Sequence, residues 1–132
     1  MTNEKLIQKA ASVIKTLKTK NGLFGDVGSA LISDNNKVHV GVCADIGDSG
    51  FCAEKNAIAS MITTGEYKFK RIVAVWKDED GDVFVIPPCG NCRELMRQIN
   101  PENLESEIVL DKDKAVKLKK LLPYHDWWQK QN

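Results

Sequence analysis

The sequence predicts an α/β fold, a three-layer α-β-α sandwich with a mixed sheet of about five strands. Two observations support this prediction. Segments with apolar residues at helical spacing alternate along the chain with short apolar or alternating segments typical of strands. The chain has 132 residues, of which 42% are hydrophobic and 28% charged, so it can bury one core and is expected to form a single domain over residues 1–132.

The first half of the chain predicts a helix, two strands and a second helix. Apolar residues recur at helical spacing from Leu6 to Leu17, and Lys20-Asn21-Gly22 is expected to end that helix. Residues 27–33 and the alternating valines of residues 38–42 predict two strands, joined by a turn at Asp34-Asn35-Asn36. The second helix is expected to begin near Cys52, with Ala57, Ile58 and Met61 on its apolar face, and to end at Gly65.

The second half continues the alternation of strands and helices. The apolar run Ile72–Trp76 is typical of a strand buried on both faces. A strand over Val83–Ile86 is stopped by Pro87-Pro88, because proline has no amide donor. The last three expected elements are a helix closed by Asn100-Pro101, a core strand over Ile108–Leu110 and a helix over residues 113–122.

The charge of the chain is nearly balanced, with 19 basic and 18 acidic side chains and a net charge of +1. Proteins that follow a phosphate backbone usually carry a basic excess, so a small-molecule substrate is expected rather than nucleic acid. No window approaches the ~20 consecutive apolar residues that span a membrane, and the polar start does not look like a secretion signal. We therefore expect no membrane partner and a cytoplasmic location.

All four cysteines are expected to be reduced in that compartment; they are Cys43, Cys52, Cys89 and Cys92. Two motifs contain three of them, Cys52-Ala53-Glu54 and Pro88-Cys89-Gly90-Asn91-Cys92. Each motif lies where a loop meets the start of a predicted helix. Residues two apart do not share a helix face, so Cys52 and Glu54 can serve one centre only beyond the end of the helix. Cys89 and Cys92 meet the same condition.

Three thiolates around Zn²⁺ would leave the fourth position of a tetrahedral site open for water, which marks a catalytic site. Glu54 is then placed to transfer protons as a general acid and base. Three thiolates and Zn²⁺ leave one net negative charge, which Lys55 and Arg93 are expected to offset. A Cys-x-Glu element followed by Pro-Cys-x-x-Cys, with the Glu not a ligand, is the pattern of zinc deaminases.

With Arg93 included, these motifs resemble those of the cytidine deaminase superfamily, in its small single-domain branch that acts on nucleosides. The segments Val27–Leu31 and Leu121-Leu122-Pro123 are also similar to that branch, so the resemblance covers nearly the whole chain. It implies that three cysteines hold Zn²⁺, that Glu54 shuttles protons, and that a free cytidine or deoxycytidine is hydrolytically deaminated in pyrimidine salvage. It also implies a homotetramer whose sites borrow residues from neighbouring subunits.

The expected substrate contacts depart from the pattern of that branch. Where its members carry Asn-x-Glu, this chain has Cys43-Ala44-Asp45, so Asp45 keeps a carboxylate for the ribose but Cys43 cannot replace an amide. The aromatic residue near the base is replaced by Gly25, with Phe24 beside it. By resemblance, the substrate-binding residues are Asp45, Cys43, Phe24, Ala53 and Trp128.

The segment before Cys52 is about two residues shorter than is typical of the branch. In this shortening and in the C-terminal segment with Trp128, the chain is similar to members of the superfamily that deaminate the nucleoside antibiotic blasticidin S. Deamination of such an antibiotic is therefore one alternative function, and a non-catalytic zinc-binding module with the same fold is another.

Several residues keep a second interpretation. Cys43 is either the fourth ligand of a structural Cys₄ site or, more simply, a small buried hydrophobe. The Cys89–Cys92 pair also fits a redox motif, but that interpretation leaves Glu54 without a role. His39 is expected at the surface or an interface, and His125 is expected at the surface or beside a substrate across a subunit boundary. Trp127 and Trp128 fit either base stacking or interface packing.

Overall fold

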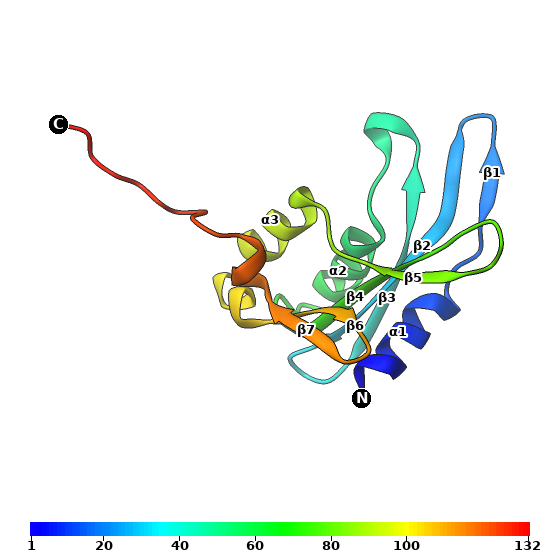
Figure 1. The fold of residues 1–132 in the computed structure, drawn as a ribbon, viewed down its shortest axis with the longest axis horizontal. Coiled ribbons are helices and arrows are strands. Elements are labelled where there is room, and N and C mark those ends of the chain that lie inside the picture. Colours follow the sequence, from blue (N-terminus) through cyan, green and yellow to red (C-terminus); the bar gives the residue numbers. More distant parts are fainter.

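The structure, a computed structural model, describes residues 1–132 and contains one seven-stranded mixed sheet with helices on both faces (Figure 1). The predicted three-layer α/β class is confirmed. None of the helices is both long and apolar enough to cross a membrane. The elements in chain order are α1 Asn3–Ser12, β1 Leu17–Thr19, β2 Gly22–Ser33, β3 Val38–Asp45, α2 Ala53–Thr63, β4 Phe69–Lys77, β5 Val83–Ile86, α3 Gly90–Ile99, β6 Glu107–Asp111 and β7 Lys114–Lys117, with short 3₁₀ helices η1 Gly47–Ser49, η2 Pro101–Glu105 and η3 Leu118–Leu121.

The sheet is organised around β2 and β4. Strand β2 pairs antiparallel with β1, β3 and β4. Strand β4 also pairs antiparallel with β5 and parallel with β6, which makes the sheet mixed as predicted. Strand β7 pairs antiparallel with β6 at the edge of the sheet. The sheet exceeds the predicted count of about five because β1 and β7 were expected to be helical.

The first helix is shorter than its apolar spacing predicts. It begins after Thr2, whose hydroxyl caps it by accepting a hydrogen bond of 3.1 Å from the Lys5 amide, and it ends at Ser12. Leu17 was expected on its buried face, but it lies in β1 and is 59% exposed. Thr19 pairs with Gly22, so Lys20 and Asn21 form the turn of a hairpin and do not end a helix.

The predicted helix over residues 113–122 is also wrong. Residues 114–117 form β7, whose Val116 pairs with Ile108, and Leu118 is the only fully buried residue of the 3₁₀ helix that follows. Pairing with β6 satisfies backbone groups that would otherwise be exposed along the edge of the sheet. This tertiary gain outweighs the helical preference of a lysine-rich segment.

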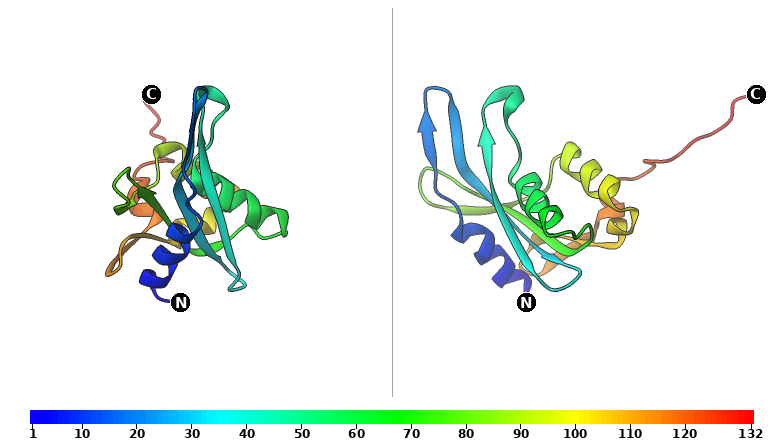
Figure 2. Two further views of the ribbon diagram at one scale, coloured as in Figure 1. Left: turned by 90° about the vertical axis from the view of Figure 1, so that its right-hand side faces the viewer. Right: turned by 180° about the vertical axis from the view of Figure 1, so that it is seen from behind.

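Each face of the sheet carries its own core, and Figure 2 shows α1 and α2 on opposite faces. On one face α1 buries Leu6 and Ala10 against the central strands. On the other face α2 and α3 pack side chains such as Met61 and Met96 against Ile72 and its neighbours. This second layer fixes the two helices whose first turns carry the cysteine motifs.

Strand β3 is covered on both faces, which corrects the expectation for His39. The alternating valines Val38 and Val40 pack toward the core of α1, as predicted for an apolar face. The opposite face is not solvated: His39 is 8% exposed, and its Nε2 lies 3.8 Å from a carboxylate oxygen of Glu66. His39 is therefore a buried residue of this chain.

Gly41 allows α2 to lie directly against β3. A Cβ atom at this position would lie 2.5 Å from the backbone nitrogen of Ala57 and 2.6 Å from the Cβ of Asn56. The Asn56 amide also donates a 3.1 Å hydrogen bond to the carbonyl of Val42. The close approach thus sets the position of α2, and with it the place of Cys52.

Replacing Gly41 by alanine is expected to destabilise the protein by about 1–3 kcal/mol, because the added methyl group overpacks a contact with rigid backbone. Displacement of α2 should also lower the zinc content. Urea unfolding and metal analysis would measure both effects. Gly90→Ala is the matched control for stability, since a Cβ there meets nothing within 4 Å. Equal unfolding free energies for the two variants would contradict the prediction.

Candidate zinc site and active-site cavity

The two cysteine motifs meet at the starts of α2 and α3. Cys52 is the residue that precedes α2, and Cys89 is the residue that precedes α3. Cys92 is the third residue of α3 and is fully buried. The ends of two helices therefore converge on one centre, as the spacing of the motifs predicts.

The three sulfur atoms lie within 4.8 Å of one another, and the Sγ atoms of Cys52 and Cys89 are 3.7 Å apart. Zinc–sulfur bonds of about 2.3 Å in a tetrahedral site place sulfur atoms about 3.8 Å apart. All four cysteines of the chain are free thiols. The cluster of Cys52, Cys89 and Cys92 therefore fits Zn²⁺, with three protein ligands and room for a fourth.

The electrostatics of these thiols also favour a bound cation. Burial raises the pKa of the Cys52 and Cys92 thiols, and the Glu54 carboxylate raises the pKa of Cys92 further. Burial also acts to raise the pKa of Cys89. The amides of Cys92 and Asn91 and the neighbouring thiols outweigh this effect, so the pKa of Cys89 lies below its ordinary value. A divalent ion supplies the positive charge that three adjacent thiolates require.

Glu54 is the second residue of α2 and lies beside the thiol cluster without joining it. Its side chain is 5% exposed, and burial raises the pKa of its carboxyl above the ordinary value. A buried carboxyl group holds its proton more readily than an exposed one, and a group on a cavity wall can exchange that proton with a bound molecule. These features suit Glu54 for the proton transfer that is expected of it.

A cavity of about 480 Å³ opens in front of Glu54 and the cysteines. This volume falls within the range of small-molecule sites. Cys52, Cys89 and Glu54 lie on its wall, and Cys43 and Asp45 contribute to the wall from the C-terminal part of β3. Ala53 also lines the cavity, so three of the five expected substrate-binding residues lie on its wall.

Phe24 and Trp128, the other two expected substrate contacts, do not line the cavity. Phe24 is half-buried and pairs with Ala44 in the ladder between β2 and β3. The aromatic residue on the cavity wall is instead Phe51, which is 44% exposed and forms a β-bridge with Ala44. Phe24 and Phe51 thus share Ala44 as a strand partner, but of the two only Phe51 lies on the cavity wall.

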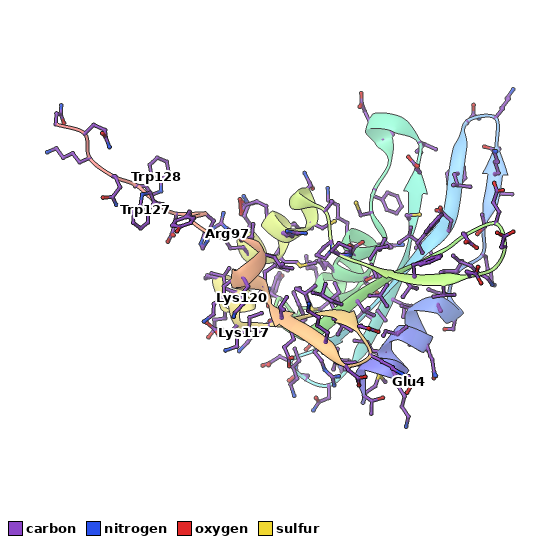
Figure 3. The ribbon with its side chains drawn as sticks, viewed as in Figure 1. Glu4, Arg97, Lys117, Lys120, Trp127 and Trp128 are labelled. Carbon is purple, nitrogen blue, oxygen red and sulfur yellow. The ribbon has the colours of Figure 1, made fainter.

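Trp128 lies on the C-terminal segment that extends away from the sheet (Figure 3). Its side chain is 85% exposed, and that of Trp127 is 64% exposed. Tyr124 and Trp127 pack edge to face with ring centres 5.5 Å apart. His125 lies close to the body, where its Nδ1 is 3.1 Å from the Leu122 carbonyl. None of these side chains reaches the cavity of its own chain.

The two basic residues expected near the zinc differ in their surroundings. Lys55 lines the cavity. The Arg93 guanidinium donates hydrogen bonds to the carbonyl of Pro88, at 2.8 Å, and to that of Leu121, at 3.3 Å. Arg93 thus ties the loop that carries Cys89 to the C-terminal 3₁₀ helix, a structural role that the sequence alone does not reveal.

Cys43 is separate from the thiol cluster. Its Sγ donates a hydrogen bond of 3.1 Å to Asp26 Oδ1, and the residue is 9% exposed. Burial and the hydrogen bond to Asp26 raise the pKa of its thiol. These contacts hold Cys43 as a neutral thiol and leave the Cys₄ alternative without its fourth ligand.

Replacing Cys43 by serine is therefore expected to leave one zinc ion bound per chain. A serine hydroxyl can donate to Asp26 in the same way, so the fold should also be retained. Metal analysis after extensive dialysis would test this expectation. Loss of the metal from this variant would restore the Cys₄ interpretation.

Asp26 and Asn91 also line the cavity, although neither was among the expected site residues. Asn91 lies between two ligands, and its place follows from that of Cys89 and Cys92. One feature of the sequence could have identified Asp26 as a site residue. It is a charged residue that lies between Gly25 and the apolar strand beginning at Val27. An acidic side chain at the entry to a buried strand calls for a specific partner, which the sequence does not identify.

Comparison with known proteins agrees with this geometry. Residues 1–105 match the family described as the cytidine and deoxycytidylate deaminase zinc-binding region. The chain is 35% identical to a blasticidin-S deaminase from Bacillus cereus over 54% of its own length, and it spans 65% of that relative.

Solved structures of cytidine deaminases share the fold. The enzyme from Burkholderia pseudomallei superposes with a TM-score of 0.73 at 27% identity, covering 93% of this chain and 98% of that one. The enzyme from Mycobacterium tuberculosis superposes with a TM-score of 0.72 at 24% identity, covering 91% of this chain and 93% of that one.

Proposed function

Because this chain belongs to the family of the cytidine and deoxycytidylate deaminase zinc-binding region, we propose that it is a zinc-dependent hydrolase that deaminates a free cytosine nucleoside. The observation that carries this proposal is the cluster of Cys52, Cys89 and Cys92 beside the buried carboxyl of Glu54, with Cys52, Cys89 and Glu54 on the wall of a cavity of about 480 Å³. The products would be a uracil nucleoside and ammonia.

In the proposed reaction, the cytosine ring enters with its C4 atom toward the thiol cluster. Zinc held there supplies Lewis acidity that makes water nucleophilic near neutral pH. Glu54 takes the proton of the attacking water and passes it to ring N3, which makes C4 electrophilic. After the attack, Glu54 takes the remaining proton of the new C4 hydroxyl group and passes it to the 4-amino group. The C4–N4 bond then breaks, ammonia leaves and a C4 carbonyl remains. The burial of Glu54 keeps bulk water from competing for these protons.

The charges of the cavity favour a nucleoside over a nucleotide. Asp26, Asp45 and Glu54 are carboxylates on its wall, and Lys55 is the basic residue there. A phosphate group placed among these carboxylates would be repelled. The site is therefore expected to reject deoxycytidylate and to accept neutral or positively charged substrates.

Two observations favour a nucleoside antibiotic as the second candidate substrate. The chain is similar to a blasticidin-S deaminase, and Cys43 is a thiol hydrogen-bonded to Asp26 where the resemblance to cytidine deaminases leads one to expect an asparagine. Both candidates require the same chemistry at C4 and differ only in the groups that the rest of the cavity must hold.

A direct test is the loss of cytosine absorbance when the zinc-loaded protein is mixed separately with cytidine, deoxycytidine, deoxycytidylate and blasticidin S. A chelated sample restored with zinc is the control. Turnover of cytidine or deoxycytidine would support a salvage enzyme, and turnover of blasticidin S alone would support antibiotic inactivation. Absence of turnover with all four would contradict the proposal and favour a non-catalytic zinc module.

The protein is further proposed to act as a homo-oligomer in the cytoplasm. Four free thiols suit a reducing compartment. Exposed aromatic side chains on the C-terminal segment and on the β4–β5 hairpin suit subunit contacts; they are Tyr124, Trp127, Trp128, Trp76 and Phe84. Light scattering would give the mass: a tetramer is expected, and a monomer at micromolar concentration would contradict the proposal.

A further inference from the structure

The wall of the cavity contains an irregularity of the sheet that brings an acidic side chain to it. Between two ladder pairs, Phe24 with Ala44 and Gly28 with Val42, β2 advances four residues while β3 moves only two. Gly25 takes a positive φ of 72° within this bulge. Bulges near active sites commonly redirect a side chain. Here Asp26 is the residue whose carboxylate reaches the cavity wall.

Two donors hold the Asp26 carboxylate in place. The Cys43 thiol donates to Oδ1 at 3.1 Å, and the Trp76 indole N–H donates to Oδ2 at 3.1 Å. The Trp76 ring is itself stacked on Phe84, with ring centres 5.6 Å apart. The carboxylate is therefore oriented by two different strands, β3 and β4.

This carboxylate retains unused capacity to accept hydrogen bonds. An ionised carboxylate offers about four lone-pair positions, and the two protein donors occupy only half of them. Asp26 accepts but cannot donate, so a complementary substrate group must be a donor. The pyrimidine ring is expected near Glu54 and the cysteines. Asp26 and Asp45 line the same cavity and belong to neither cysteine motif, so they are available to the other half of the substrate.

We propose that Asp26 determines substrate specificity, because its carboxylate accepts a hydrogen bond from a hydroxyl or ammonium group on the non-pyrimidine half of the substrate. Cys43 and Trp76 act as positioning residues for this carboxylate. The inference rests on the proposed function in assuming that the pyrimidine lies at the zinc end. On this proposal, the role of Cys43 is to donate a hydrogen bond to the carboxylate that the bulge in β2 brings to the cavity wall.

The test measures binding rather than turnover, in protein that carries Glu54→Gln and zinc so that ligands are not consumed. Calorimetry would give dissociation constants for cytidine, 2′,3′-dideoxycytidine and blasticidin S, with and without Asp26→Asn. Loss of a hydrogen bond to a charged group is expected to weaken binding about 10- to 100-fold. Asp48→Asn is the matched control, since Asp48 is an exposed carboxylate in η1 that does not line the cavity.

The three ligands distinguish the source of the donor. If it is a sugar hydroxyl, Asp26→Asn should weaken cytidine binding and leave dideoxycytidine binding nearly unchanged. If it is an ammonium group, only blasticidin S should lose affinity. Equal losses for all three ligands would mean that Asp26 is merely structural, and no loss for any would likewise overturn the proposal.

A second comparison does not depend on the folding of the Asp26 variant. Trp76→Phe keeps the aromatic ring but removes the N–H donor to Asp26, and it should raise KM while leaving kcat nearly unchanged. If the wild-type protein turns over none of the substrates but its affinity depends on Asp26 as described, the proposed function fails and this inference stands. If turnover is observed and affinity does not depend on Asp26, the proposed function stands and this inference fails.

Discussion

Glu54→Gln is expected to lower kcat by about 10²- to 10⁴-fold while the protein keeps its zinc. Glutamine preserves the size of the side chain but cannot take up and return a proton. Glu54 is not a member of the thiol cluster, so its replacement removes no ligand. Its near-complete burial also leaves little access for a water molecule to take over the proton transfers.

The comparison requires kcat and metal content for the same preparations. Glu79→Gln, which removes an exposed carboxylate, serves as the matched control and should behave like the wild type. Glu54→Asp keeps the acid but withdraws it by one methylene group, so its activity should lie between the two. A Glu54→Gln protein with kcat within tenfold of the wild type would exclude the proposed proton transfers.

Cys92→Ser is expected to abolish zinc binding and to lower the thermal stability of the protein markedly. The thiol is fully buried at the junction of α3 with the core, and a serine hydroxyl is a poor zinc ligand. A ligand present at one hundred times its Kd stabilises the folded state by about 2.7 kcal/mol, and this contribution would be lost. The buried hydroxyl adds a desolvation cost of its own.

These two causes can be separated by melting the wild-type protein before and after chelation. The drop caused by chelation reports the metal alone, and any further drop in Cys92→Ser reports the buried hydroxyl. Cys43→Ser provides the control for a cysteine outside the cluster. Retention of a full equivalent of zinc by Cys92→Ser would remove this residue from the ligand set.

The parts of the site that the sequence predicts are those set by local rules. The positions of Cys52, Cys89 and Cys92 at the starts of two helices predict that their thiols lie close together. The structure contains this cluster. The hairpin turn at Lys20-Asn21 and the strand over residues 114–117 were missed because local periodicity contains no information about pairing partners. Strands β1 and β7 form because their backbones pair with those of β2 and β6.

The cavity-wall residues outside the cysteine motifs were harder to predict for a different reason. The position of Asp26 depends on a bulge between β2 and β3, and the register of two strands is not visible in either strand alone. The same holds for Phe51, which reaches the cavity wall through a bridge to Ala44. The cysteine cluster is therefore predictable from the sequence, whereas the other residues of the cavity wall are brought there by tertiary geometry.

Cys52 and Cys89 are separated by 37 positions in the chain, and one ion bound by both would close this stretch into a ring. The ring contains α2, β4 and β5, including the strand at the centre of the sheet. Closing a loop of this length removes conformational entropy from the unfolded chain. The amide hydrogens of α2 and α3 should therefore exchange with solvent as one cooperative unit when metal is bound, and as two independent units after it is removed.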